Sequence, residues 1–176
     1  MPVNAARDRF RLLARGLFAL LAAGRAVPAL SQKQYDPGAS DTEIVIGNIM
    51  PYSGPASAYG VVGRALSAYF DKINAEDGGI NGRRIRFISL DDGYSPPRAV
   101  EQARKLVELE RVLLITQVLG TPSNSAIQRY MNQRKVPQLF AASGATRWGD
   151  PAAFPWTMGW QPSYQSEARI FASHIL

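Results

Sequence analysis

Hydroxyl side chains and glycines gather in short polar segments that follow the apolar runs of this sequence. The residues are Ser53, Ser57, Thr121, Ser123, Ser143 and Thr146, with Gly120 and Gly144 beside them. Hydroxyl groups and open backbone N–H groups at the start of a helix favour a negatively charged group. Together these groups are suited to binding a small carboxylate. Taken singly, each hydroxyl is better explained as a helix cap or a turn former.

Aromatic rings accompany these hydroxyls in the segment PYSGPASAYG at 51–60. Its prolines and glycines let the backbone turn away from the apolar run that precedes it. Tyr52 and Tyr59 can supply flat apolar walls with polar tips. The composition of this segment therefore suggests part of a binding surface, since a plain connection needs none of these rings.

Groups for catalysis are scarce. The sequence has one histidine, His174, and no cysteine, so we expect neither a Ser–His nor a Cys–His nucleophile and no histidine or thiolate metal site. The phosphate-binding patterns G-x-x-x-x-G-K-[ST] and G-x-G-x-x-G are absent. Asp91 and Asp92 suit a metal or a general base, but carboxylates at a strand end more often cap a neighbouring helix or bond loop amides, and we favour that structural role. No enzyme activity, metal or cofactor is expected.

Apolar runs alternate with helical patterns along the chain. The runs predict strands at 43–49, 85–90, 112–118, 136–142 and 156–160. Apolar residues at helical spacing lie between and after them, at 62–73, 96–107, 121–131 and 163–176. In the last of these helices we expect four apolar residues to face inward, namely Ala168, Phe171, Ala172 and Ile175.

This alternation predicts an α/β fold, an open parallel sheet with helices on both faces. Ligands bind such sheets in the crevice outside the carboxyl ends of the strands. The loops expected at that edge are 51–60, 91–95, 119–123, 143–150 and 160–163. The hydroxyls and rings described above fall within these loops, so the predicted fold brings them to one edge.

The first 31 residues have the layout of a secretory signal peptide. A basic stretch is followed by an apolar run at 17–23 and by the small-x-small triplet at 29–31, which predicts cleavage after Ser31. An amphipathic N-terminal helix is the alternative. Residues 32–41 then form a short polar arm before the domain at 42–176. Five arginines and one aspartate lie in the first 31 residues, which leaves only +2 of the net charge of +6 for the rest, so no nucleic-acid partner is expected.

The order of several motifs resembles one known family. DTEIVIGNIMPYSGPASAYG, INAEDGGINGRRIRFISLDDGYSPPRAVEQARKLV, LGTPSNSA and SGAT follow one another within residues 42–176. This series is similar to the extracytoplasmic solute-binding proteins of branched-chain amino acid ABC transporters, the leucine/isoleucine/valine-binding type. The resemblance implies a two-lobed, type I periplasmic binding fold in a periplasmic monomer. A small solute is trapped as the lobes close, and the closed form docks on membrane permease subunits.

The resemblance also implies roles for individual residues. The first lobe holds a carboxylate through the loops matching Gly120–Thr121 and Gly144–Ala145–Thr146, while Tyr59 lines the pocket and Ser53 stands at its rim. The second lobe, which holds the ammonium group of an amino acid, is absent from this chain. Pro122 and Asn124 replace the serine-rich run typical of amino acid binders. The expected solute is therefore a branched-chain amino acid or a related organic acid, including aromatic ones.

Three functions compete at this point. A transport binding protein is favoured. An enzyme lobe of a Rossmann-like hydrolase or dehydrogenase would need a nucleophile or a cofactor loop, and neither is visible. A ligand-sensing domain of a receptor or of an amide-type regulator shares the same fold. A second α/β lobe followed by a stop would support transport, whereas a membrane span or a kinase domain would support sensing.

Overall fold

The computed structural model describes residues 33–176, and the signal-peptide prediction at 1–31 lies outside the described residues. The chain divides into two units, Met1–Gln34 and Tyr35–Leu176. The second unit contains a five-stranded sheet of order β2-β1-β3-β4-β5 with every pair parallel. The strands are β1 (Glu43–Met50), β2 (Arg84–Asp91), β3 (Leu114–Thr116), β4 (Gln138–Ala141) and β5 (Thr157–Gly159).

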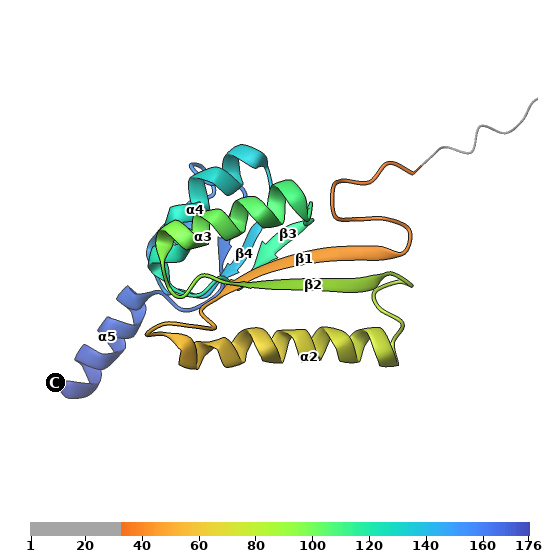
Figure 1. The fold of residues 1–176 in the computed structure, drawn as a ribbon. Coiled ribbons are helices and arrows are strands. Elements are labelled where there is room, and N and C mark those ends of the chain that lie inside the picture. The colour runs from red at the N-terminus through yellow and green to blue at the C-terminus, as the bar shows by residue number, and fades with distance from the viewer. Residues whose placement is uncertain (1–32) are drawn as a thin grey trace, which may run out of the picture. The chain divides into compact units, whose positions relative to one another are not determined.

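Helices cover both faces of the sheet, as predicted. Helix α2 lies along one face, while α3 and α4 lie on the other (Figure 1). The helical segments are η1 (Ser57–Tyr59), α2 (Gly60–Glu76), α3 (Pro96–Arg104), the π-helical turn η2 (Lys105–Leu109), α4 (Thr121–Arg134), η3 (Thr146–Gly149) and α5 (Tyr164–Ile175).

The main core lies between the sheet and α3 and α4. Its fully buried members come from the central strands and from the inner stripes of the helices. They include Ile49, Ile115, Ala99, Ala103, Leu106, Ile127 and Met131. Each large aliphatic side chain buried in this way contributes roughly 1.5–3 kcal/mol to folding. This core holds the ends of β1, β3 and β4 in fixed relation, and the loops at those ends carry the candidate site.

Two strands are shorter than predicted, and a residue with a left-handed backbone follows one of them and interrupts the other. β3 ends at Thr116, since Gln117 adopts a left-handed φ of 55° that takes the chain out of the extended region. Pairing resumes only as an isolated bridge between Leu119 and Ala142. β4 runs over Gln138–Ala141, and Phe140 has a φ of 55° where the register with β5 shifts. Both irregularities lie next to the carboxyl edge of the sheet, where such features re-aim the following loop.

The prediction that α5 buries an apolar face is wrong for the described chain. The helix forms, and Ser163 caps it by accepting a hydrogen bond from the backbone N–H of Ser166 at 3.1 Å. However, none of its residues is buried, and Ala168, Phe171, Ala172 and Ile175 are all exposed. The reason is position, because α5 projects away from the sheet and does not pack along it (Figure 1).

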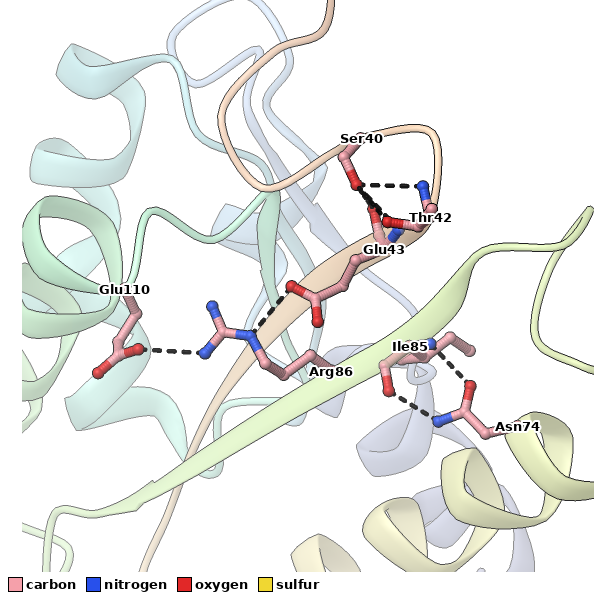
Figure 2. A network of polar contacts seen from close by, with 7 residues as sticks. All are labelled: Ser40, Thr42, Glu43, Asn74, Ile85, Arg86 and Glu110. Carbon is pink, nitrogen blue, oxygen red and sulfur yellow. Dashed lines mark hydrogen bonds and ion pairs between the residues drawn. The ribbon is translucent and has the colours of Figure 1, made fainter.

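Buried and surface polar contacts tie the amino end of the sheet to its surroundings (Figure 2). Arg86 on β2 forms ion pairs with Glu43 and Glu110, each at 3.2 Å, and such exposed pairs contribute at most about 1 kcal/mol. Asn74 at the end of α2 is nearly buried. Its side chain donates to the carbonyl of Ile85 at 2.8 Å and accepts from the N–H of Ile85 at 2.7 Å, which fastens α2 to β2.

Replacing Asn74 with alanine is expected to lower the free energy of unfolding by about 2 kcal/mol, because the buried N–H and C=O of Ile85 then lose their partner. Chemical denaturation followed by circular dichroism measures this loss. Asp71→Ala, at an exposed position of the same helix, serves as the control and should change stability by less than about 0.5 kcal/mol. Equal effects of the two variants would contradict the assigned role.

Candidate functional site

The loop after β1 is fixed by the carboxylate of Asp91 at the end of β2. Asp91 accepts hydrogen bonds from the backbone N–H groups of Tyr52 (2.8 Å), Ser53 (3.1 Å) and Gly93 (2.9 Å) and from the Ser53 hydroxyl (2.5 Å). Arg98 pairs with it at 3.0 Å. Burial raises the pKa of Asp91, but the hydrogen bonds from Ser53, Gly93 and Tyr52 outweigh burial and hold the pKa well below its ordinary value.

The neighbouring carboxylate has a similar structural role. Asp92 is buried and accepts hydrogen bonds from the N–H of Tyr94 at 2.9 Å and from the hydroxyl of Ser123 at 2.7 Å. It thereby joins the loop after β2 to the first turn of α4. The interpretation of both aspartates as ligands of loop amides is confirmed, and their oxygens are occupied by donors of the protein itself.

A cleft of about 370 Å³ opens at the carboxyl edge of the sheet. Three tyrosines from three different segments of the chain line it, together with small or apolar residues. The lining residues are Pro55, Ala56, Tyr59, Tyr94, Leu119, Gly120, Ala142, Gln161 and Tyr164. Tyr59 and Tyr164 are each more than half exposed, so their rings are open to a bound molecule. We call this the tyrosine cleft.

A polar cluster adjoins the tyrosine cleft where α4 begins. The hydroxyls of Thr121 and Ser143 are hydrogen-bonded at 2.6 Å, and Ser143 is almost completely buried. The backbone N–H of Ala145 donates to the Ser143 hydroxyl at 3.2 Å. Tyr164 is near this cluster, and the Gly144 backbone first, then the Ser143 side chain and, more weakly, Thr121 lower the pKa of its phenol. We call these four groups the hydroxyl cluster: Thr121, Ser143, the Gly144 amide and Tyr164.

The two glycines predicted to admit a ligand instead make room for tyrosine rings. A Cβ added at Gly120, which has a φ of 84°, would lie 2.4 Å from a ring carbon of Tyr94. A Cβ added at Gly144 would lie 2.6 Å from a ring carbon of Tyr164. The absence of a side chain therefore allows these rings to sit directly on the backbone of the loops. This is the local reason why Tyr94 and Tyr164 reach the cleft.

The structure distributes the predicted site residues over neighbouring positions. Tyr59 and Gly120 line the tyrosine cleft, and Thr121 and Gly144 belong to the hydroxyl cluster. Ala145 and Thr146 line an adjacent cleft of about 420 Å³ with Trp148 and Trp160, and Gln161 borders both clefts. Ser53 gives its hydroxyl to Asp91 and does not line the tyrosine cleft. Their roles in binding a solute remain predictions.

Sequence reasoning missed Tyr94 and Tyr164 as site residues. Both follow strands at the predicted functional edge, in or just after the loops 91–95 and 160–163, and that position was the available signal. The pairing of each ring with a glycine from another loop depends on three-dimensional contact and leaves no mark in the local sequence. Ser143 was recognised only as one of several loop hydroxyls.

Residues 33–176 contain no group of three or more His, Cys, Asp or Glu side chains placed to bind a metal ion. Among its helices, none combines the length and the apolar character needed to cross a membrane. His174, the one histidine, is exposed on α5.

The sheet and the cleft outside its carboxyl ends define an α/β ligand-binding domain. Residues 43–175 match the family model described as periplasmic binding protein, and the chain belongs to this family. Its fold is that of the type I periplasmic binding proteins, and the prediction of an open parallel sheet is confirmed. The family consists of substrate-binding proteins, which places the chain in the periplasmic or extracellular compartment.

Individual relatives agree with this assignment. The chain is 34% identical over 74 residues to an amino acid binding protein of Pseudomonas aeruginosa, covering 42% of this chain and 20% of that protein. A possible leucine/isoleucine/valine-binding protein from Rhodopirellula baltica superposes with a TM-score of 0.68 and 25% identity, over 80% of this chain and 37% of that one. A fatty acid ABC transporter substrate-binding protein from Thermomonospora curvata superposes with a TM-score of 0.53 and 30% identity, over 60% of this chain and 27% of that one. The chain thus spans well under half of the length of these relatives.

Proposed function

We propose that this protein is the extracytoplasmic solute-binding component of an ABC importer. It captures a small carboxylate-bearing solute, a branched-chain amino acid or a related organic or aromatic acid, and delivers it to the membrane permease subunits. In this proposal the domain at 42–176 is the first of two lobes, and a second lobe closes over the tyrosine cleft. The protein acts as a monomer without a cofactor and catalyses no reaction.

The observation that carries the proposal is the tyrosine cleft with the hydroxyl cluster beside it. Three rings supply apolar walls, and hydroxyl and amide donors supply partners for an anionic end. The cluster lies at the first residue of α4, where unpaired N–H groups and the helix dipole favour negative charge. Pockets for small solutes combine these elements, mostly apolar walls with a few well-placed polar groups. The membership of a substrate-binding family supports the same function.

Mass spectrometry of solute retained by the full-length protein, purified from its native compartment without denaturation, tests this function. We expect a stoichiometric carboxylate-bearing small molecule. A retained sugar, a retained cation or a preparation without any bound solute would speak against the proposal. The same preparation from a strain without the permease should retain the same solute, because capture precedes delivery.

Export is expected to remove residues 1–31. The basic, apolar and small-residue segments in that order are the signal that a leader peptidase reads. Sequencing the N-terminus of the mature protein should therefore give Gln32, within a few residues. Intact Met1 on protein recovered from the cytoplasm of a normally exporting cell would contradict this expectation.

Thr121→Val is expected to weaken the binding of a carboxylate solute by about tenfold to a hundredfold. Valine keeps the shape of threonine but removes the hydroxyl, and a hydrogen bond to a charged group contributes roughly 1.5–3 kcal/mol. Calorimetry with the acid and with its methyl ester separates this effect from a change in packing. The ester should bind more weakly to the wild-type protein and lose little further in the variant.

Tyr59→Ala provides the matched comparison. Its ring is expected to stack on the solute whatever the charge, so acid and ester should lose affinity by the same factor. If Thr121→Val also weakened both by the same factor, the Thr121 hydroxyl would make no contact with the anionic group, and the carboxylate would bind elsewhere.

A further inference from the structure

Helix α4 carries a stripe of polar side chains that bonds the part of the chain after β4. The stripe follows the spacing i, i+4, i+7 and i+11, so its members share one side of the helix, and they are Thr121, Ser125, Gln128 and Asn132. Asn132 donates to the hydroxyl of Thr157 at 2.8 Å, and Gln128 is only 1% exposed. The stripe is therefore a contact surface within the protein.

Arg147 on η3 bonds the middle of this stripe. Its Nε and Nη2 donate to the side-chain oxygen of Gln128 at 3.1 and 2.9 Å, and its Nη1 donates to the hydroxyl of Ser125 at 3.0 Å. Among residues 33–176, Arg147 is the only hydrogen-bond partner of the Gln128 side-chain amide. A planar guanidinium that makes several such bonds is fixed in direction as well as in place.

Trp148, the next residue, attaches η3 to β5. It is buried, and the guanidinium carbon of Arg147 lies 5.4 Å from the centroid of its ring. A Cβ added at Gly159 of β5 would lie 2.8 Å from the Cβ of Trp148, so the tryptophan packs directly on the backbone of that strand. Two adjacent side chains thus join η3 to α4 and to β5.

The segment 143–147 is consequently attached to the stripe at both of its ends. The hydroxyls of Ser143 and Thr121 bond at 2.6 Å at one end, and Arg147 bonds the stripe at the other. Residues 144–146 lie between these two points, and they are the residues of this loop that were predicted to hold a carboxylate. Their placement relative to the first turn of α4 depends on both attachments.

We propose that Arg147 is the positioning residue of the anion site. By bonding Gln128 and Ser125, it holds residues 144–146 in the arrangement that receives the anionic end of the solute. The inference rests on the proposed function, since it names the side chain that keeps the predicted site in order. Arg147 lines neither the tyrosine cleft nor the adjacent cleft at Thr146, so it acts through the loop and not by contact with the solute.

Loss of these bonds is expected to weaken binding by reducing the order of the loop. Without Arg147, residues 144–146 lose one of their two attachments to α4, and restoring a single arrangement on binding costs conformational entropy. The apparent affinity falls by the fraction of time that the loop spends in the binding arrangement. A loop in that arrangement for about one tenth of the time would bind about tenfold more weakly.

The alternative is that Arg147 attracts the anion by its charge from a distance. The two possibilities differ at Gln128. Gln128→Met removes the acceptor of two hydrogen bonds and leaves the charge of Arg147 in place. It therefore weakens anion binding if Arg147 acts by position, and leaves binding unchanged if Arg147 acts by charge alone.

The experiment uses full-length protein with benzoate as the anionic probe and methyl benzoate as its uncharged match. Calorimetry of Arg147→Met and of Gln128→Met is expected to show about a tenfold loss for benzoate and less than threefold for the ester. The double variant should lose no more than either single one, because both changes break the same contact. Arg129→Met, which removes an exposed arginine from the same helix, is the control and should change neither affinity by more than threefold.

Hydrogen exchange provides a readout that does not need a bound probe. The backbone amides of residues 144–147 should exchange about tenfold faster in Arg147→Met and in Gln128→Met, since the loop opens more often. The amide of Ile127 in the middle of α4 should keep its wild-type rate. A general loss of stability would instead speed exchange at Ile127 and in the loop alike.

Several results would overturn the proposal. Benzoate affinity lost in Arg147→Met and kept in Gln128→Met would show attraction by charge. Equal losses for benzoate and its ester, with faster exchange throughout, would show a merely structural role, and unchanged exchange at 144–147 would show that Arg147 does not hold the loop. Failure of the proposed function has a different signature: the wild type binds no benzoate and retains no solute, which overturns the anion site, while exchange at 144–147 still responds to Arg147→Met.

Discussion

Replacing Gly120 with alanine is expected to lower the free energy of unfolding by about 3–5 kcal/mol and to close part of the tyrosine cleft. Two costs combine. The backbone at Gly120, with φ 84° and ψ 151°, lies in a region that is nearly exclusive to glycine and costs other residues about 1–3 kcal/mol. In addition, the new Cβ would lie 2.4 Å from a ring carbon and 2.6 Å from the hydroxyl oxygen of Tyr94, so the ring must move. Overpacking of this kind costs roughly 1–3 kcal/mol.

Alanine substitutions at two other glycines serve as controls that separate the backbone cost from the overpacking cost. Gly78 also has a positive φ, of 69°, but its added Cβ meets nothing within 4 Å, so Gly78→Ala reports the cost of a positive φ without a clash. Gly149 has neither a positive φ nor a close neighbour, and Gly149→Ala should be nearly neutral. Chemical denaturation should rank the losses as Gly120, then Gly78, then Gly149. A loss at Gly120 no larger than that at Gly78 would show that Tyr94 adapts freely and does not fix the wall of the cleft.

Asp91→Asn is expected to destabilise the protein by about 3 kcal/mol at neutral pH. The amide of asparagine keeps one acceptor oxygen but has no charge. Its NH₂ group replaces the second carboxylate oxygen, so it faces N–H and O–H donors and cannot accept their hydrogen bonds. Hydrogen bonds to a charged group contribute roughly 1.5–3 kcal/mol each and are not additive. The loop at 51–60 should become mobile, because Tyr52 and Ser53 lose their common partner. Hydrogen exchange of that loop, together with urea unfolding, measures both effects.

The pH dependence of this loss has a definite sign. The folded-state pKa of Asp91 lies below its unfolded value of about 3.9. The carboxylate therefore contributes its stability fully above that unfolded value, and the contribution declines as pH falls toward the lower folded-state pKa. The difference between wild type and Asp91→Asn should thus be large at pH 7 and shrink below about pH 4. A difference that stays constant down to acid pH would mean that the charge of Asp91 is irrelevant.

Much of the fold was predictable because its determinants are local. The run at 43–49 is apolar on successive residues, as a strand covered on both faces requires, and β1 extends it by a single residue. The inner stripe of α3 and of the turn η2 after it followed from spacing alone, and Ala99, Ala103 and Leu106 are fully buried. The early end of β3 was not predictable, since nothing in the type of Gln117 demands a left-handed backbone. The exposure of α5 was missed because an apolar stripe indicates that a helix can be buried and does not identify the surface that covers it.

The location of the candidate site at the carboxyl edge of the sheet was predictable, but the contacts between its residues were not. Loop position brought Tyr59, Gly120 and Thr121 to the carboxyl ends of the strands, and the structure places them there. The division between the tyrosine cleft and the neighbouring cleft at Thr146 depends on where Tyr164 and Gln161 fall, and these come from a later segment of the chain. Such long-range contacts have no local signature, and neither does the capture of the Ser53 hydroxyl by Asp91.

The place of β1 between β2 and β3 sets the time at which this domain can fold. β1 pairs with β2 on one side and β3 on the other, and the Asn48 side chain bonds the carbonyl of Thr116, which lies 68 residues away. During synthesis at about 5–20 residues per second, roughly 3 to 13 seconds separate the appearance of Met50 from that of Thr116. Throughout that interval the first strand has an unsatisfied edge, and the long-range pairing of a parallel sheet is itself slow. A nascent chain with this strand order therefore stays unfolded well after its first strand has emerged, and it is open to a translocase, to a chaperone or to aggregation during that time.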